Sequence, residues 1–246
     1  MRFATALAAM AALLISLPAA AQKAPEKAEP LKAEVVRAEA VKKLPAILTE
    51  PDPENTWLLD LSSGGRVTIR LRPDAAPQMV ERIKTLTRRH FYDGLLFFRV
   101  NDAPEGMAQG GDPNNNGTGE SDLPDLPAEF NKLPHLRGVV SAARHGAPEN
   151  ATPEQIKAAH DSANSQFFVM LTPKLAFDEN YTVFGRVTEG MQWIDAMERG
   201  EPPANPTKIL RAWIAADNPP PYQPTAPDLP VGETEVVLPG AAPPGP

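Results

Sequence analysis

Short apolar runs of strand length, separated by turn residues, restrict the fold of this chain more than any other feature. The segments TWLLDLSS and RVTIRLRP flank Gly64 and Gly65, and in the second segment Val67, Ile69 and Leu71 alternate with polar residues. This period of two around a Gly-Gly turn is typical of a β-hairpin. Further runs of the same kind are LLFFRV, GVVSAAR, SQFFVMLT, TVFGRVTEG and KILRAWIAAD. The pattern predicts a mainly β domain.

Two segments, residues 76–94 and residues 189–200, instead carry apolar residues at helical spacing, and each ends at a glycine. Helices and strands do not alternate regularly, so a parallel βαβ sheet is not indicated. A closed antiparallel barrel or a sandwich is the expected architecture. The apolar helical positions are Met79, Val80, Ile83 and Leu86 in the first segment and Met191, Ile194 and Met197 in the second.

The N-terminal residues 1–21 read MRFATALAAMAALLISLPAAA, with one arginine, an apolar run and small residues at Ala19 and Ala21. This order is typical of a signal peptide that is cleaved before Gln22. A retained membrane anchor is the alternative, but a spanning helix needs about 20 apolar residues and this run is shorter. We therefore expect an exported, periplasmic protein without a membrane span after cleavage; secretion outside the cell is the other possible destination.

The segments on either side of the domain contain residues that bury little surface. Residues 22–53 combine Ala, Glu, Lys and Pro, which predicts a spacer, with a docking helix as the alternative. Residues 218–246 hold ten prolines and neither lysine nor arginine. They predict a disordered proline-rich tail, or a ligand for a proline-binding module. The folded domain is expected over residues 54–217.

The composition argues against several kinds of site and partner. The chain has no cysteine, so it can form neither a disulfide nor a thiolate metal site. Its four histidines are not spaced as metal ligands. Residues 112–120 match the start of a calcium-binding loop, but position twelve of that loop, which must be glutamate, is Leu123. We expect no metal and no cofactor. With a net charge of −7 and scattered basic residues, we expect a monomer that does not bind nucleic acid.

A single arginine within an apolar run is the most unusual feature of the domain. Strand alternation places Phe97 and Arg99 on one face and Phe98 and Val100 on the other. The same rule places Gln166 and Phe168 on a shared face. The residues alone leave two interpretations of Arg99: a functional guanidinium among aromatic side chains, or a surface arginine whose stem covers a ring.

Five motifs resemble, in the same order along the chain, the cyclophilin-type peptidyl-prolyl cis/trans isomerases: FYDGLLFFRV, MAQGGDP, GTG, NSQFFVML and YTVFGRVTEGM. The resemblance covers about residues 56–217. It implies a closed eight-stranded antiparallel β-barrel capped by two α-helices. It also implies catalysis on proline-containing polypeptides without a cofactor. The barrier to X–Pro rotation arises from C–N conjugation and is ~18–20 kcal/mol, so catalysis must weaken that conjugation.

Matched by position, the resemblance gives roles to nine residues. Arg99 matches the arginine that donates hydrogen bonds to the twisting prolyl amide, a task for which lysine lacks the rigid fork. Met107 and Phe168 match the apolar floor under the proline ring. Gln109 and Gln166 match polar groups that hold the substrate backbone or orient the arginine. The remaining matches along the substrate groove are Ala143, Arg144, Phe177 and Tyr181.

The chain also departs from the family pattern. Gly106 stands where the family usually has phenylalanine, which predicts a more open proline pocket. Ala176 and Phe177 stand in place of a tryptophan-leucine pair, and Tyr181 in place of a histidine. Residues 146–163 are longer than the matching family segment and contain a possible short helix; this insertion either narrows the groove or is an inert surface feature.

Three functional hypotheses follow. The first is an exported isomerase that accelerates the folding of exported proteins at X–Pro bonds. The second is a peptide-binding chaperone or scaffold that keeps the barrel but has lost turnover, a hypothesis motivated by Gly106 and Ala176. The third is a structural envelope protein, presented on the spacer, which needs no pocket.

Overall fold

The computed structural model of the protein describes residues 52–222, which form one folded domain. The signal peptide, nearly all of the spacer and most of the proline-rich tail lie outside the described residues, so these assignments stay predictions. Short 3-10 helices begin and end the domain, η2 (Pro53–Asn55) and η4 (Ala215–Asp217).

Eight strands form one antiparallel sheet in the order β3-β4-β6-β5-β7-β2-β1-β8. The predicted hairpin is confirmed, because Leu61 pairs with Gly65 across the turn and β2 buries every second residue. The mainly β, antiparallel class is confirmed with it. The strands are β1 (Thr56–Leu61), β2 (Gly65–Leu71), β3 (Arg99–Asn101), β4 (Met107–Gly110), β5 (Val139–Ala142), β6 (Phe167–Met170), β7 (Val183–Glu189) and β8 (Ile209–Ile214).

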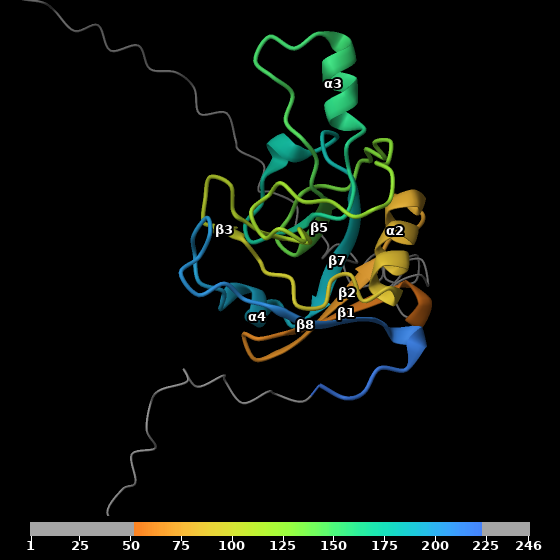
Figure 1. Ribbon diagram of the computed structural model, residues 1–246, viewed down its shortest axis with the longest axis vertical. Helices are drawn as coiled ribbons and strands as arrows, with labels where there is room; N and C mark the ends of the chain where they lie inside the picture. Colours follow the sequence, from red (N-terminus) through yellow and green to blue (C-terminus); the bar gives the residue numbers. More distant parts are fainter. Residues whose placement is uncertain (1–51, 223–246) are drawn as a thin grey trace, which may run out of the picture. The chain divides into compact units, whose positions relative to one another are not determined.

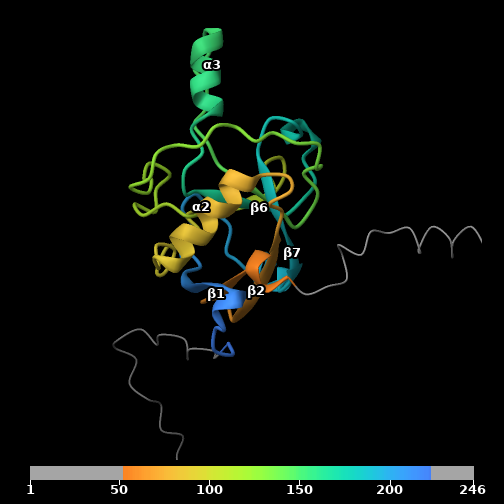
Figure 2. The same ribbon diagram turned by 90° about the vertical axis from the view of Figure 1, so that its right-hand side faces the viewer.

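The described residues contain three α-helices: one in each of the two segments predicted to be helical, and the short helix that the sequence left possible in the insertion. α2 (Pro77–Arg88) and α4 (Met191–Asp195) lie in the two predicted helical segments. The third, α3 (Pro153–His160), lies in the insertion and stands away from the body of the domain (Figures 1 and 2). It starts at a capping box formed by Thr152 and Gln155, which explains how a largely exposed segment begins a helix. A short 3-10 helix, η3 (Leu175–Phe177), precedes β7.

The sheet separates two apolar clusters. In the larger one, α2 buries the four predicted apolar positions, and Trp57 meets Phe167 edge-to-face with ring centroids 4.9 Å apart. The smaller cluster contains Met107, Phe168, Met170 and nearby valines. Because successive strand residues point to opposite faces, Phe167 enters the main core while Phe168 enters the smaller cluster. The small cluster lies at the candidate site.

The run LLFFRV forms less strand than predicted, and its predicted alternation is wrong. Phe97 and Val100 both enter the main core, whereas Phe98 and Arg99 both line a surface groove. The cause is a change of partner: the amide of Phe97 donates to Thr207 O, whereas β3 pairs with β4 from Arg99 onward. The pleat therefore does not continue through this junction. β4 itself was not predicted as a strand.

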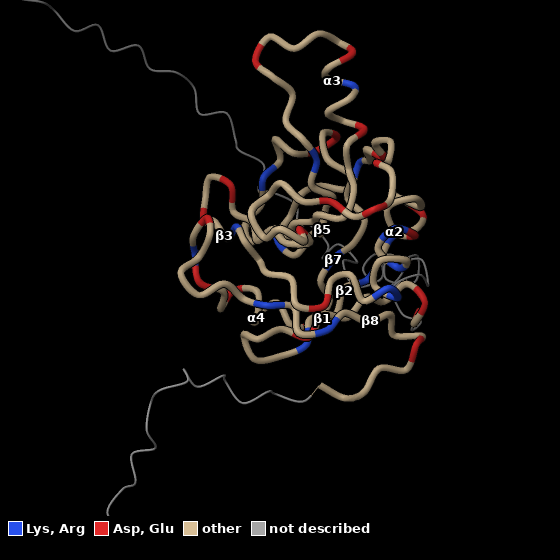
Figure 3. The backbone as a smooth tube through the Cα atoms, viewed as in Figure 1, with Lys and Arg blue, Asp and Glu red and all other residues tan. Residues whose placement is uncertain are grey.

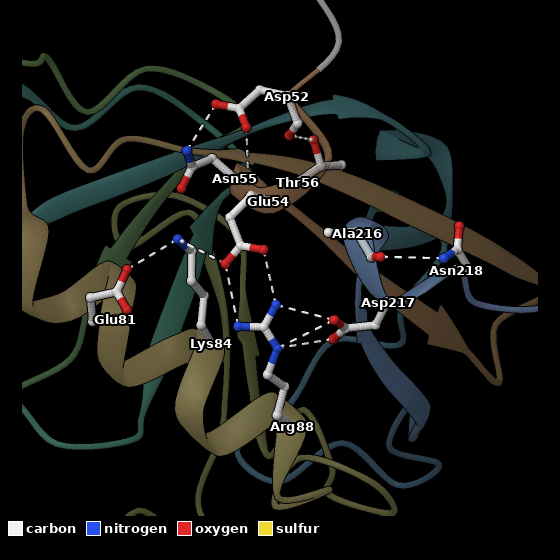
Figure 4. A network of polar contacts seen from close by, with 10 residues as sticks. All are labelled: Asp52, Glu54, Asn55, Thr56, Glu81, Lys84, Arg88, Ala216, Asp217 and Asn218. Carbon is white, nitrogen blue, oxygen red and sulfur yellow. Dashed lines mark hydrogen bonds and ion pairs between the residues drawn. The ribbon is translucent and has the colours of Figure 1, made fainter.

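Arg88 on α2 holds both ends of the described domain (Figure 4). Its guanidinium donates to Glu54 in η2 at 3.0 Å and to Asp217 in η4 at 3.1 Å. Lys84 forms a further ion pair with Glu54 at 3.5 Å. The hydrogen bond from Arg88 holds the pKa of Glu54 below its usual value. Exposed pairs contribute about 0–1 kcal/mol each, so this network mainly fixes the position of the two ends.

Acidic and basic residues are interspersed over the described chain (Figure 3). The first tail residues contact the hairpin: Arg66 donates to Pro220 O at 2.8 Å, and the Tyr222 hydroxyl donates to Leu61 O at 3.3 Å. Within residues 52–222, no helix is both long and apolar enough to span a membrane.

Candidate functional site

A small cavity of about 90 Å³ lies over the smaller apolar cluster, and eight of the nine predicted site residues line it. We call it the aromatic pocket. β3, β4 and β6 supply its charged edge and its floor, while the segment after β5 and the segment before β7 supply its walls. Its lining consists of Arg99, Met107, Gln109, Ala143, Arg144, Phe168, Phe177 and Tyr181.

Three rings enclose the apolar part of the aromatic pocket. The ring centroid of Phe168 lies 5.5 Å from that of Tyr181 and 5.9 Å from that of Phe177, and Phe177 and Tyr181 are 4.7 Å apart. The Arg144 guanidinium lies over the Tyr181 ring at 4.5 Å. Phe168 meets the other two rings edge-to-face, and the three rings together form an apolar surface that fits a small saturated ring.

A chain of buried polar side chains packs beneath these rings, and no local sequence motif marks it. The Ser141 Oγ lies 3.0 Å from His135 Nε2, and His135 Nδ1 lies 2.9 Å from Asp178 Oδ1. This is the connectivity of a hydrolytic triad, but Ser141 and His135 are fully buried, so a substrate cannot reach the hydroxyl. His135 packs against Phe168, Phe177 and Tyr181. These three polar residues therefore hold the rings of the aromatic pocket in place.

The pKa values of His135 and Asp178 are both lowered, but for different reasons. Burial lowers the pKa of His135, which favours the neutral imidazole. The backbone N–H of His135 donates to Asp178 and is the main cause of a lowered pKa for that carboxyl. The result is an ionised Asp178 beside a neutral ring at neutral pH.

Arg99 meets Gln109 across the β3–β4 ladder, where the two residues are in register. Arg99 Nη1 donates to Gln109 Oε1 at 3.4 Å. Gln109 Nε2 in turn donates to Gln166 Oε1 at 2.9 Å, and Gln166 Nε2 donates to Gly119 O at 2.8 Å. Gln166, the one predicted residue outside the aromatic pocket, thus connects the arginine to the glycine-rich loop.

Glu201 is a residue of this site that sequence reasoning missed. Its Oε1 lies 2.6 Å from Arg99 Nη2, and this hydrogen bond is the main cause of a lowered pKa for Glu201. Arg99 Nε is buried and makes no hydrogen bond within residues 52–222. A buried donor without a partner costs free energy, and such costs are typical of functional sites.

A larger polar groove of about 340 Å³ adjoins the aromatic pocket and shares Arg99, Gln109, Ala143 and Arg144 with it. An extended peptide advances about 3.3 Å per residue. When one residue of a substrate peptide occupies the aromatic pocket, its neighbours in that peptide would therefore lie in the adjoining polar groove. Its other lining residues are Phe98, Asn116, Gly117, Glu120, His145, Gly146, Ser162, Asn164, Gln166 and Glu201.

Gly106 is required by its own turn. Its φ is +60°, and a β-carbon built there would lie 1.8 Å from Thr172 Oγ1. Both the left-handed backbone and this contact make a larger residue costly at this position. Gly106 is not among the residues that line the aromatic pocket. Within residues 52–222, no three His, Cys, Asp or Glu side chains are grouped so as to hold a metal ion.

Comparison with protein families matches residues 58–214 to the model described as cyclophilin type peptidyl-prolyl cis-trans isomerase/CLD. A probable peptidyl-prolyl cis-trans isomerase of Brucella suis is 41% identical over 182 residues, which cover 68% of this chain and 85% of that protein. Peptidyl-prolyl cis-trans isomerase B of Bacillus subtilis is 33% identical over 142 residues, covering 57% of this chain and 89% of that protein.

Solved structures give the same fold. A cyclophilin from Hirschia baltica superposes with a TM-score of 0.57 at 26% identity, covering 68% of this chain and 76% of that chain. A cyclophilin type peptidyl-prolyl cis-trans isomerase from Cryptosporidium parvum superposes with a TM-score of 0.55 at 18% identity, covering 65% of this chain and 98% of that chain.

Proposed function

The chain belongs to the cyclophilin-type peptidyl-prolyl cis-trans isomerases, and from this membership we propose that the aromatic pocket holds the proline of an X–Pro peptide while Arg99 catalyses rotation. The enzyme interconverts the cis and trans forms of X–Pro bonds. One observation carries the assignment of the site: eight of the nine residues named from the sequence line a single pocket, with the guanidinium at its edge.

The proposed chemistry needs directed hydrogen bonds. Conjugation along C–N holds the X–Pro amide planar, with a barrier of ~18–20 kcal/mol. As the bond twists, the prolyl nitrogen becomes pyramidal and its lone pair becomes able to accept a hydrogen bond. Arg99 donates to that nitrogen and thereby stabilises the twisted amide more than the planar one, which is the condition for catalysis.

The other residues hold the peptide while it rotates. Met107 and Phe168 form the floor under the proline ring, and Phe177 and Tyr181 close its sides. With the ring fixed there, rotation moves the residues before proline, on the side of the polar groove. Gln109 holds Arg99 at the boundary between the two.

We further propose that the sheet closes into a barrel. β3 and β8 are the two ends of the strand order. Single bridges, Leu96 to Lys208 and Val100 to Gly200, link the chain around β3 to two residues that precede β8. Two backbone hydrogen bonds, from Gly94 N to Ile209 O at 2.7 Å and from Ile209 N to Leu95 O at 2.8 Å, support the same closure.

We propose that the enzyme is exported to the periplasm and acts as a monomer on exported proteins during folding. The support is the signal-peptide pattern of residues 1–21, which ends in small residues at Ala19 and Ala21 ahead of the expected cleavage site at Gln22. Immunoblots of periplasmic and cytoplasmic fractions test the location; a full-length, uncleaved protein in the cytoplasm contradicts it.

The direct test of the site is cis–trans exchange of an Ala-X-Pro-Phe peptide, measured by NMR so that no protease is needed. Mature protein starting at Gln22 is compared with Arg99→Ala, with the fold of both checked by circular dichroism. We expect acceleration by the first and a loss of at least a hundredfold in the second. Equal acceleration by both would show that Arg99 is not the catalytic group. Binding without acceleration would favour the peptide-binding scaffold.

A further inference from the structure

We propose that Glu201 is the main positioning residue for Arg99, and this inference rests on the proposed role of Arg99 in catalysis. Glu201 comes from the loop between α4 and β8, far from β3 in the sequence. Its Oε1 forms an ion pair with Arg99 Nη2 at 2.6 Å, and its Oε2 accepts a hydrogen bond from Asn101 Nδ2 at 3.4 Å. One carboxylate therefore meets two β3 side chains that share a face of the strand.

The backbone holds Glu201 in this place. Gly200 exchanges two hydrogen bonds with Val100, each of 2.9 Å, directly beside Arg99. Gly200 has a φ of +155°, and a β-carbon built there would lie 2.7 Å from Pro203 Cα and 2.8 Å from Pro202 O. The turn thus requires glycine before Glu201, and two prolines stiffen it afterwards. The carboxylate is therefore presented by a segment whose backbone has few alternative conformations.

Of the two contacts that hold the guanidinium, the one with Glu201 is the stronger. The contact with Gln109 is 3.4 Å long and has a neutral acceptor, which is beyond the usual range of an N–H···O hydrogen bond. The contact with Glu201 is 2.6 Å long and joins two charges. Arg99 also keeps the pKa of Glu201 low, so the carboxylate stays ionised at neutral pH. Without Glu201, a long side chain that is about one-third exposed would regain rotamer freedom.

This arrangement leaves donors free for the substrate. Each terminal nitrogen of a guanidinium carries two hydrogens. Nη1 contacts Gln109 and Nη2 forms the ion pair with Glu201, so we expect each nitrogen to keep a hydrogen for the twisting amide. The opposing effect of the carboxylate is to reduce the positive potential at the pocket. Truncation of Glu201 should lower activity if alignment of Arg99 dominates, and raise it if the reduced positive potential dominates. An experiment can therefore separate the two effects.

The test compares Glu201→Ala and Glu201→Gln with the unaltered enzyme in the NMR exchange assay. Glu189→Ala, an exposed carboxylate on β7 outside the site, is the matched control for the loss of one charge. We expect Glu201→Ala to lower kcat about tenfold with KM within about twofold, because it releases a group that must be aligned. Glu201→Gln should stay within about threefold of the unaltered enzyme, since its amide oxygen still accepts from Nη2. Activity of Glu201→Ala at or above the original overturns the proposal, and so does Glu201→Gln falling as far as Glu201→Ala.

A second readout does not depend on catalysis. The ¹⁵N relaxation of the Arg99 Nε–H reports how rigid the side chain is on the picosecond to nanosecond timescale. We expect an ordered side chain in the unaltered protein and in Glu201→Gln, and a mobile one in Glu201→Ala. Unchanged order in Glu201→Ala overturns the positioning role. If Arg99→Ala keeps full activity while Arg99 proves ordered by Glu201, the catalytic role fails and the positioning contact stands.

Discussion

Replacement of Arg99 by lysine separates the charge of this residue from its geometry. The arginine reaches two partners on different sides with two different nitrogens, at 3.4 Å from Gln109 and 2.6 Å from Glu201. Lysine keeps the charge but has one nitrogen, which can lie beside only one of them. Because the carboxylate is the charged acceptor, the ammonium should move to Glu201 and away from the prolyl amide.

The expected loss of activity follows from the hydrogen bond to the prolyl amide that Arg99→Lys no longer makes. If Arg99 acts through a hydrogen bond formed in the transition state, its removal costs about 2.7–4 kcal/mol, or a factor of about 10²–10³ in kcat. Arg99→Lys should therefore lose nearly as much activity as Arg99→Ala. The free energy of unfolding should change by less than about 1 kcal/mol, since the side chain is partly exposed and its ion pair with Glu201 can re-form.

The assay is NMR exchange of the proline peptide, with urea unfolding measured on the same samples. Arg211→Lys is the matched control, because Arg211 also pairs with one carboxylate, Asp93 at 2.9 Å, but lies outside the site. Its activity should stay within the error of the unaltered enzyme. Retention of more than about a third of the activity by Arg99→Lys, with the fold intact, would refute the geometric reasoning and leave charge alone as the relevant property of Arg99.

Three further predictions concern the frame around the site. Burial lowers the pKa of His135, so the unfolded protein binds more protons than the folded one, and the free energy of unfolding should fall as pH drops below about 6.5. Urea unfolding of His135→Asn should show a smaller dependence of this free energy on pH, and an unchanged dependence would contradict the reasoning. Arg88→Met should lower stability by about 1 kcal/mol, less at high salt, and leave catalysis unchanged; a loss above about 3 kcal/mol would show that its contacts with η2 and η4 are not solvent-screened. Gly106→Ala should lower the free energy of unfolding by about 1–3 kcal/mol, through the contact with Thr172 and the left-handed backbone. Adding Thr172→Ala should restore the part due to the contact, and no recovery in the double variant would rule that contact out.

The sequence by itself determined the class of the domain and most of its strands. The alternation of Val67, Ile69 and Leu71 predicted the burial of β2, because a period of two places every second side chain on one face whatever lies opposite. The order of the family motifs predicted a common pocket, since residues with matched positions in a shared fold converge in space. Eight of the nine residues named in this way line the aromatic pocket.

Only the tertiary structure decided the features that depend on chain segments far apart. The faces of Phe98 and Arg99 depend on where the backbone changes its hydrogen-bonding partner, which no local period records. The support of the aromatic wall by His135 and the contact of Glu201 with Arg99 join loops whose spacing along the chain carries no motif. Sequence patterns record what each segment buries, whereas the partner of a polar side chain is set by how the sheet brings distant loops together.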